Sequence, residues 1–151
     1  MPAETEGMLD LEQLSHLVRA NEIETVIVVF PDLYGRFMGK RFDADFFIDS
    51  VATGGTHCCS YLLTADMEME PIPGYSLANW EKGYGDFHMV PDLSTLRRAS
   101  WLEKSALVIC DLIDDKTNQS IDAAPRSILR AQVERAADAG FQVMAASELE
   151  Y

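Results

Sequence analysis

The feature that most constrains the fold is a β-branched run, TVIVVF at residues 25–30, which is followed at once by chain-breaking residues. β-branched and aromatic side chains favour extended backbone, whereas the next string, PDLYG at residues 31–35, favours a turn. Residues 36–42 return to an extended pattern. The sequence therefore predicts a β-hairpin, which requires a fold that contains an antiparallel sheet.

Short helices are predicted on either side of this hairpin. Asp10 stands before leucines at helical spacing, and Gln13 lies three residues on, where a capping-box partner is expected. The buried face of this first helix consists of Leu11, Leu14, Leu17 and Val18. After the hairpin, Asp45 is expected to cap a short helix over residues 46–48. A further extended segment is predicted at residues 58–63.

The middle of the chain, residues 66–85, is predicted to be irregular. Prolines and glycines recur there too often for a long helix or strand, at Pro71, Pro73, Gly74, Gly83 and Gly85. A loop of this length inside a folded domain is usually functional or lies at an interface. Extended structure is expected to return at residues 87–90.

The last third of the chain has the pattern of a strand, a helix and a second strand. Residues 106–110 are a short apolar run, and a polar turn follows them. A helix is predicted from Pro125, which suits a first helical position, to a stop at Gly140. Residues 141–146 are expected to begin the second strand. A soft boundary near residues 101–104 then separates a small sheet-and-helix domain from the start of another.

Composition limits the partners that this chain can have. Its 25 acidic and 12 basic residues give a formal charge of -13, which repels nucleic-acid phosphates and anionic lipid headgroups. Three cysteines, two of them adjacent at Cys58 and Cys59 and one in an apolar run at Cys110, indicate reduced thiols rather than a disulfide framework. No secretory or membrane-spanning segment is encoded. We therefore expect a cytoplasmic protein that binds neither nucleic acid nor membranes.

An acidic pair near the end of the chain is the first candidate for a chemical site. If Glu148 and Glu150 lie on a strand, they project from the same face about 6.6 Å apart. Divalent cations such as Mg²⁺ or Mn²⁺ prefer oxygen ligands of this kind. Taken alone, however, an acidic triplet of this form is common in acidic proteins, so its context must decide.

That context is an ordered set of motifs that resembles the glutamine synthetase family. The motifs are GDFHMVPDLSTL at residues 85–96, ALVICDL at 106–112, PRSIL at 125–129 and SELEY at 147–151. They occur in the order and approximate spacing of that family. The stretch FPDLYGRFMGKR at residues 30–41 is also similar to the family's amino-terminal hairpin, so the resemblance covers nearly the whole chain.

The resemblance implies an α+β fold in two parts. Residues 1–103 would form a β-grasp-like amino-terminal domain, and residues 104–151 would supply the first strand-helix-strand of a glutamine-synthetase-like catalytic domain. Most of that second domain would lie beyond Tyr151. The chain is accordingly expected to be the front portion of a larger enzyme and to be inactive by itself. Family members assemble into homo-oligomeric rings, which the resemblance implies for the full-length protein.

The implied activity is an ATP-dependent ligation. Family members phosphorylate the side-chain carboxylate of glutamate, and ammonia or an amine then displaces the phosphate to form an amide. By the match to the family's first glutamate pair, Glu150 would bind the metal ion near the substrate carboxylate. Glu148 would bind the ion that bridges the ATP phosphates. Such ions, Mg²⁺ or Mn²⁺, neutralise the transferring phosphoryl group.

The amine pocket departs from the family pattern. Glutamine synthetases carry an Asp-Gly-Ser-Ser run that helps to bind ammonium and to accept its proton, and this run is absent here. The nearest substitute is Asp66, although it needs extra residues before Asp86 relative to the usual spacing. Ammonia is the first expectation for the acceptor, and a polyamine or another primary amine is the alternative. A non-catalytic structural or interaction relative is the rival of another class.

Overall fold

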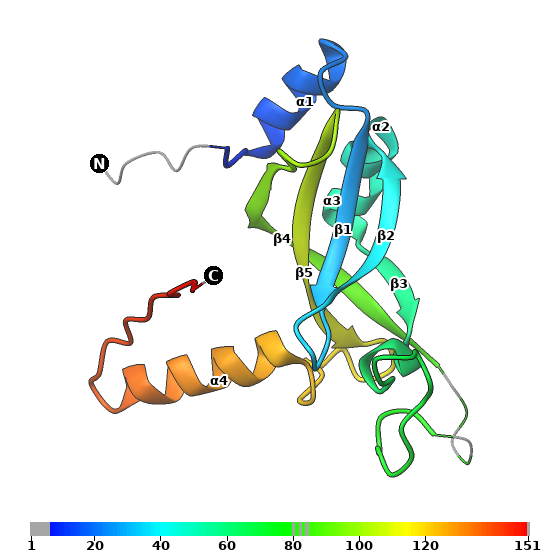
Figure 1. Ribbon diagram of the computed structural model, residues 1–151, viewed down its shortest axis with the longest axis vertical. Helices are drawn as coiled ribbons and strands as arrows, with labels where there is room; N and C mark the ends of the chain where they lie inside the picture. The colour runs from blue at the N-terminus through cyan, green and yellow to red at the C-terminus, as the bar shows by residue number, and fades with distance from the viewer. Residues whose placement is uncertain (1–6, 80, 82, 84, 151) are drawn as a thin grey trace.

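A β-hairpin begins the sheet of this protein, whose computed structural model describes residues 7–79, 81, 83 and 85–150 (Figure 1). Strand β1 (Thr25–Pro31) pairs antiparallel with β2 (Phe37–Asp43). The two strands approach closely at Gly39, where an added Cβ atom would lie 2.0 Å from the Val28 carbonyl oxygen. The predicted hairpin is therefore confirmed, and only glycine fits at that point of it.

The hairpin is one edge of a five-stranded mixed sheet with the order β2-β1-β5-β4-β3. The other strands are β3 (Thr56–Cys59), β4 (Asp86–Arg98) and β5 (Ser105–Asp114). Strand β5 runs parallel to β1 and antiparallel to β4, and β3 pairs antiparallel with β4. The predicted division of the chain at residue 103 precedes β5, which lies at the centre of this sheet. That division stays a prediction.

Helix α1 (Leu11–Arg19) begins as the sequence predicts. The Asp10 carboxylate accepts a 2.7 Å hydrogen bond from the Gln13 backbone, and the Gln13 side chain accepts one of 2.8 Å from the Asp10 backbone. This reciprocal pairing satisfies two amide groups that a helix start leaves without partners. Leu14 is fully buried, and Leu11, Leu17 and Val18 pack against the core.

The helical turns after β2 differ from the prediction in their cap. They comprise α2 (Ala44–Phe46), a π-helical turn (Phe47–Val51) and α3 (Ala52–Gly54). The capping carboxylate is that of Asp43, which accepts a 3.1 Å bond from the Phe46 amide, and not that of Asp45. Because β2 runs directly into the helix, its last residue is the cap, and Asp45 falls in the first turn.

Two predicted segments have different bounds in the structure. The extended segment expected at residues 58–63 is β3 only as far as Cys59, and Ser60–Leu63 is a 3₁₀ helix. The strand expected at residues 87–90 is longer, since β4 runs for 13 residues. Between them, the described residues from 66 to 85 contain turns, bends and isolated bridges, as predicted.

The main core lies between the sheet and helices α1, α2 and α3 (Figure 1). Its largest fully buried side chains include Phe30, Phe47 and Phe87, and the rings of Phe30 and Phe87 meet edge to face with centroids 5.1 Å apart. Burial of each such side chain contributes about 1.5–3 kcal/mol. Cys58 and Cys110 belong to this core, and all three cysteines are free, as predicted.

Helix α4 (Pro125–Asp138) begins and ends where the sequence predicts. Pro125 is at its first turn, and Gly140 follows it with a φ of 83°. None of its residues is buried, and it extends away from the sheet (Figure 1). At 14 residues it is the longest helix described, and no described helix is long and apolar enough to cross a bilayer.

The strand predicted for residues 141–146 is absent from the structure. Residues 141–150 have no regular secondary structure, and Phe141, Val143 and Met144 are exposed. A strand is stabilised by hydrogen bonds to a neighbouring strand, and none of the five strands of the described sheet pairs with this segment. The prediction of a strand at residues 141–146 is therefore wrong for this structure.

Candidate functional site

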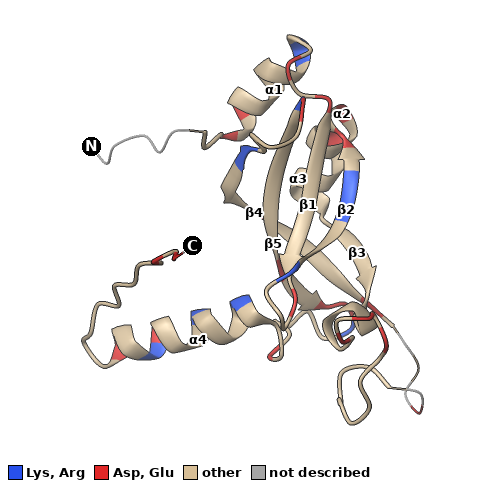
Figure 2. Ribbon diagram, viewed as in Figure 1, with Lys and Arg blue, Asp and Glu red and all other residues tan. Residues whose placement is uncertain are grey.

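Four charged side chains join the start of α4 to the sheet. The Arg126 guanidinium donates from Nε to Asp111 Oδ1 at 2.9 Å and from Nη2 to Asp92 Oδ2 at 2.5 Å. One turn later, Arg130 Nη2 donates to Asp111 Oδ2 at 2.7 Å. Asp92 lies in β4 and Asp111 in β5. We call these four residues the arginine clamp, and Figure 2 shows the basic residues of α4 beginning beside the end of β5.

The charge states within the clamp reinforce its contacts. Burial by itself would raise the pKa of Asp92, but hydrogen bonds from Ser94 and Arg126 outweigh it and hold that pKa below its ordinary value. Burial likewise acts to lower the pKa of Arg126, and the Asp111 and Asp92 carboxylates more than reverse this effect. Both partners therefore stay charged at neutral pH, which strengthens their hydrogen bonds.

The predicted metal ligands lie beyond α4. Glu148 and Glu150 are exposed and stand in the segment that has no regular structure, so the same-face spacing of a strand does not apply to them. Their carboxylate oxygens suit Mg²⁺ or Mn²⁺ in kind, but such ions need about six ligands. Among the described residues, no three His, Cys, Asp or Glu side chains gather closely enough to hold a metal ion. The assignment of this pair to metal stays a prediction.

Asp66 organises the irregular loop that contains it. Its Oδ1 atom accepts hydrogen bonds from the backbone amides of Glu68 at 3.0 Å and Glu70 at 2.9 Å. Its backbone carbonyl accepts a 3.0 Å bond from Arg36 Nη2, which reaches over from the turn between β1 and β2. Asp66 is half-buried in this position. Its predicted role toward an amine is untested.

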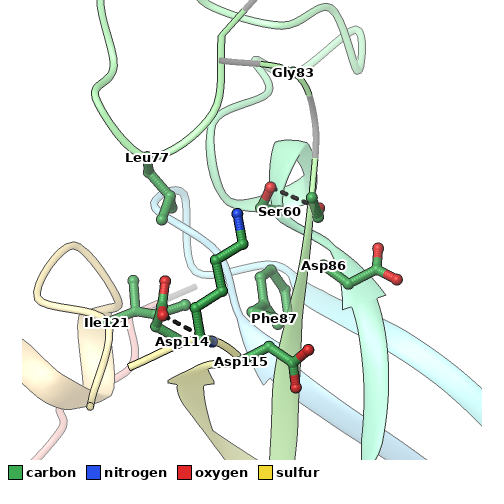
Figure 3. Close-up of a pocket in the computed structure, with 10 residues that line it drawn as sticks. Ser60, Leu77, Gly83, Asp86, Phe87, Asp114, Asp115 and Ile121 are labelled. Carbon is green, nitrogen blue, oxygen red and sulfur yellow. Dashed lines mark hydrogen bonds between the residues drawn. The ribbon is translucent and has the colours of Figure 1, made fainter. Parts of the chain in front are cut away.

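A pocket of about 330 Å³ opens where the irregular loop meets the ends of β4 and β5 (Figure 3). Leu77 of the irregular loop and Ser60 of the 3₁₀ helix line it together with Phe87 of β4 and Asp114 of β5. The backbone and hydroxyl hydrogen bonds of Thr117 lower the pKa of Asp114, whose carboxylate thus shapes the turn after β5. The Ser60 hydroxyl donates to the Gly85 carbonyl at 2.7 Å. These polar groups are engaged with the protein itself.

The histidine beside the paired cysteines lies at the surface. His57 is exposed, its Nε2 atom is 3.1 Å from Asp115 Oδ1, and its ring stacks on that of His88 with centroids 4.7 Å apart. Its neighbour Cys58 is buried, as expected for adjacent residues on a strand. His57 is therefore a surface residue, whereas Cys58 belongs to the core.

Comparisons with known proteins connect this geometry to a family. The chain is 46% identical over 143 residues to a γ-glutamylethanolamide synthetase of Streptomyces coelicolor, a match that covers 95% of this chain and 31% of that protein. It is 30% identical over 146 residues to a glutamate–isopropylamine ligase of a Pseudomonas species, covering 97% of this chain and 32% of that ligase. This chain is homologous to a glutamine synthetase-like family.

The match covers the amino-terminal part of these glutamine synthetase-like relatives. The chain spans about a third of their length. It is also 29% identical over 139 residues to lengsin of Rattus norvegicus, which covers 90% of this chain and 24% of lengsin. No family model matches the sequence.

Solved structures agree with the glutamine synthetase-like assignment at the level of the fold. The structure aligns with GmaS in complex with ADP at a TM-score of 0.62 and 23% identity, covering 83% of this chain and 26% of GmaS. It aligns with a novel glutamine synthase homologue at a TM-score of 0.64 and 20% identity, covering 78% of this chain and 27% of that one. The shared feature is the mixed sheet with few helices, and the narrower β-grasp description is not established.

The sequence alone did not predict the arginine clamp, whose contacts join α4 to β4 and β5. Asp92, Asp111 and Arg126 each lie inside one of the motifs quoted for the resemblance, and Arg130 follows the last of these motifs directly, but the sequence alone gives none of the four a role. A partial signal was present, because Arg126 and Arg130 are one helical turn apart and so share a face of α4.

Proposed function

We propose that this chain is the amino-terminal part of an ATP-dependent ligase that joins the γ-carboxylate of glutamate to a primary amine. The observation that carries the proposal is the 46% identity, over 95% of the chain, to a γ-glutamylethanolamide synthetase. The names of that relative and of the glutamate–isopropylamine ligase both specify an organic amine. Both names also support a small amine as the acceptor substrate.

Ammonia, the first expectation from the sequence, gives way to an organic amine in this proposal. Neither named ligase refers to ammonia as its acceptor. The absence of the Asp-Gly-Ser-Ser run supports the same conclusion, because that run serves ammonium in glutamine synthetases proper. An amine with a carbon substituent needs space that ammonia does not, and the irregular loop at residues 66–85 is where this chain departs from the ammonia pattern.

The proposed chemistry divides the amide synthesis into two transfers. The glutamate γ-carboxylate attacks the terminal phosphorus of ATP, which releases ADP and gives a γ-glutamyl phosphate. The amine nitrogen then attacks that acyl carbon, phosphate leaves, and the nitrogen loses a proton to give the amide. Glu148 and Glu150 would help to hold Mg²⁺ or Mn²⁺, which supplies positive charge to the phosphoryl group when bound. Asp66 is the proposed acceptor of the amine proton.

A chimera tests this function, because the chain spans only a third of its named relatives. The matched first third of the Streptomyces coelicolor synthetase would be replaced by this chain, and phosphate release would be measured with ATP, glutamate and a panel of acceptors. The panel would contain ammonia, ethanolamine, isopropylamine and putrescine, and the unaltered synthetase would be the control. We expect turnover with at least one organic amine that exceeds turnover with ammonia.

The panel also separates the alternatives. Preference for ammonia would restore the first expectation and contradict the amine proposal. A folded chimera that turns over no acceptor would favour a non-catalytic structural relative. We further propose that the full-length protein is a homo-oligomeric ring, and mass photometry of the same chimera would check this. A monomeric, fully active chimera would contradict the ring.

A further inference from the structure

Helix α4 extends away from the sheet and has no buried apolar face that would fix its direction. None of its residues is buried, and Ile128, Leu129 and Val133 are exposed. The chain just before the helix is fixed in the core, because Ile121 and Ala124 are buried. A buried attachment at one point locates the start of a helix but leaves its direction free, so other contacts must set the angle at which α4 leaves.

The arginine clamp supplies those contacts from two neighbouring strands. Val90 of β4 stands opposite Asp111 of β5, so these two side chains project from the same face of the sheet. Asp92 is two residues after Val90 and therefore shares that face with Asp111. One guanidinium bridges the two carboxylates, and its planar fork fixes the orientation of its own side chain. Arg130 adds a second attachment one turn further along. Two contacts at different heights on a helix determine its direction, whereas one does not.

Partial burial of the arginine clamp strengthens the contacts that set the angle of α4. The side chains of Arg126, Asp92 and Asp111 are 24%, 24% and 21% exposed, so solvent screens the two Arg126 pairs less than surface pairs, whereas Arg130 is 47% exposed and its pair is screened more. Two acids and two bases also balance in charge, which leaves no uncompensated ion at the junction. In the described part of the chain, these three ion pairs join α4 to β4 and β5.

We propose that the arginine clamp is a positioning device that fixes the direction of α4 and thereby the place of the segment that carries Glu148 and Glu150. Its purpose rests on the proposed function, since that function assigns the two carboxylates to metal. A 14-residue helix is roughly 21 Å long, so a tilt of about 10° at its base moves its end by about 4 Å. A misplacement of about 1 Å can already cost a catalytic site about 100-fold.

The test measures the angle of α4 directly in the 151-residue chain and needs no substrate. Nitroxide labels would be attached to p-acetylphenylalanine at two exposed positions, Lys40 in β2 and Ala137 in α4, which leaves the native cysteines unmodified. Pulsed electron paramagnetic resonance then gives the distribution of distances between them. We expect a narrow distribution for the labelled parent and a clearly wider one for R126Q. Arg135→Gln, an exposed change in the same helix, is the matched control and should stay narrow.

Two further variants distinguish a change in the direction of α4 from a general loss of the fold. Arg126→Lys keeps the charge but loses the fork, so its distribution should be intermediate in width. Asp92→Asn removes the charge that Arg126 contacts, while the amide oxygen can still accept the hydrogen bonds from Ser94, so this variant gives the result even if R126Q fails to fold. Far-UV circular dichroism and thermal unfolding should be nearly unchanged for R126K and D92N. Distributions for D92N and R126K as narrow as that of R135Q would overturn the proposal, while leaving the ligase assay of the chimera unaffected.

Discussion

The Arg36 guanidinium donates from Nε to the buried carboxylate of Asp32 at 2.6 Å and extends its other nitrogens to the irregular loop. Nη2 reaches the Asp66 carbonyl at 3.0 Å, and Nη1 reaches that of Met67 at 3.3 Å. Asp32 also accepts from the backbone amides of Tyr34 and Arg36 itself. One side chain thus joins the β1–β2 turn to the loop that holds the proposed amine-site residue.

Replacement of Arg36 by glutamine is expected to destabilise the fold. Asp32 is only 2% exposed, and an ion left without its partner in such a place is costly. Since Arg36 itself is 25% exposed, we expect a loss of about 1–3 kcal/mol in the free energy of unfolding. Urea denaturation would measure it, with Arg19→Gln as an exposed control on α1. An equal midpoint for the two variants would show that the bridge is dispensable.

Gly39→Ala is expected to weaken the hairpin by crowding rather than by loss of a contact. The new Cβ atom would lie 2.0 Å from the Val28 carbonyl oxygen and 2.9 Å from the Val29 Cα, both of which are backbone atoms that move little. Overpacking of this kind costs about 1–3 kcal/mol or more. Gly54→Ala is the matched control, because its Cβ atom would meet nothing within 4 Å. Thermal unfolding should separate the two, and similar melting temperatures would contradict the close approach.

The three thiols should differ in reactivity because burial differs among them. Burial raises the pKa of the Cys110 thiol to about 12 from an ordinary 9.0, and burial also raises that of Cys58. Iodoacetamide at about pH 8, a condition under which only the thiolate reacts, should modify Cys59 first and the other two only after unfolding. Mass spectrometry of native and urea-treated samples would check this order. Early alkylation of Cys110 would contradict its place in the core.

The raised pKa of Cys110 should make the fold less stable at high pH. The folded pKa of Cys110 lies above its ordinary value, so the fold favours the neutral thiol. The contribution of the buried Cys110 thiol to the free energy of unfolding is therefore complete below pH 9.0 and is lost as the pH rises toward 12. A Cys110→Ala variant should lose less stability across that range than the parent protein.

Local features of the fold could be predicted from the sequence because their causes lie within a few residues. The Asp10–Gln13 capping box, the β1–β2 hairpin and the ends of α4 at Pro125 and Gly140 each depend on neighbouring side chains. The mistaken cap at Asp45 was a shift of two residues, since the sequence does not show how directly β2 enters the helix.

Features that depend on distant pairing could not be predicted in this way. The place of β5 between β1 and β4, and the absence of a strand over residues 141–146, are set by which segments meet in space. The clamp is similar, since Arg126 and Asp92 are 34 residues apart. The resemblance supplied the candidate residues Asp66, Glu148 and Glu150, and the geometry of this chain leaves their roles to experiment.

Asp66→Asn tests the amine role of that residue without disturbing its loop. An amide oxygen can accept the hydrogen bonds from Glu68 and Glu70 that the carboxylate now accepts, so the change removes mainly the charge. In the active chimera we expect a higher KM for the amine and a little-changed KM for glutamate. Glu68→Gln, an exposed change in the same loop, is the control. Equal effects of the two variants on both substrates would remove Asp66 from the amine site.

Glu148→Gln and Glu150→Gln test the metal pair in the same chimera. A bound divalent ion stabilises the transferring phosphoryl group by several kcal/mol, so loss of one ligand should lower kcat by about 100-fold or more. Mn²⁺ affinity, followed by its electron paramagnetic resonance signal, should fall in parallel, whereas Glu134→Gln on α4 should change neither quantity. Since Glu148 and Glu150 are exposed here and have no third ligand among the described residues, the 151-residue chain alone should bind Mn²⁺ weakly and release no phosphate. Wild-type rates and affinities in E148Q and E150Q would contradict the assignment, even if the chimera remained an amine ligase.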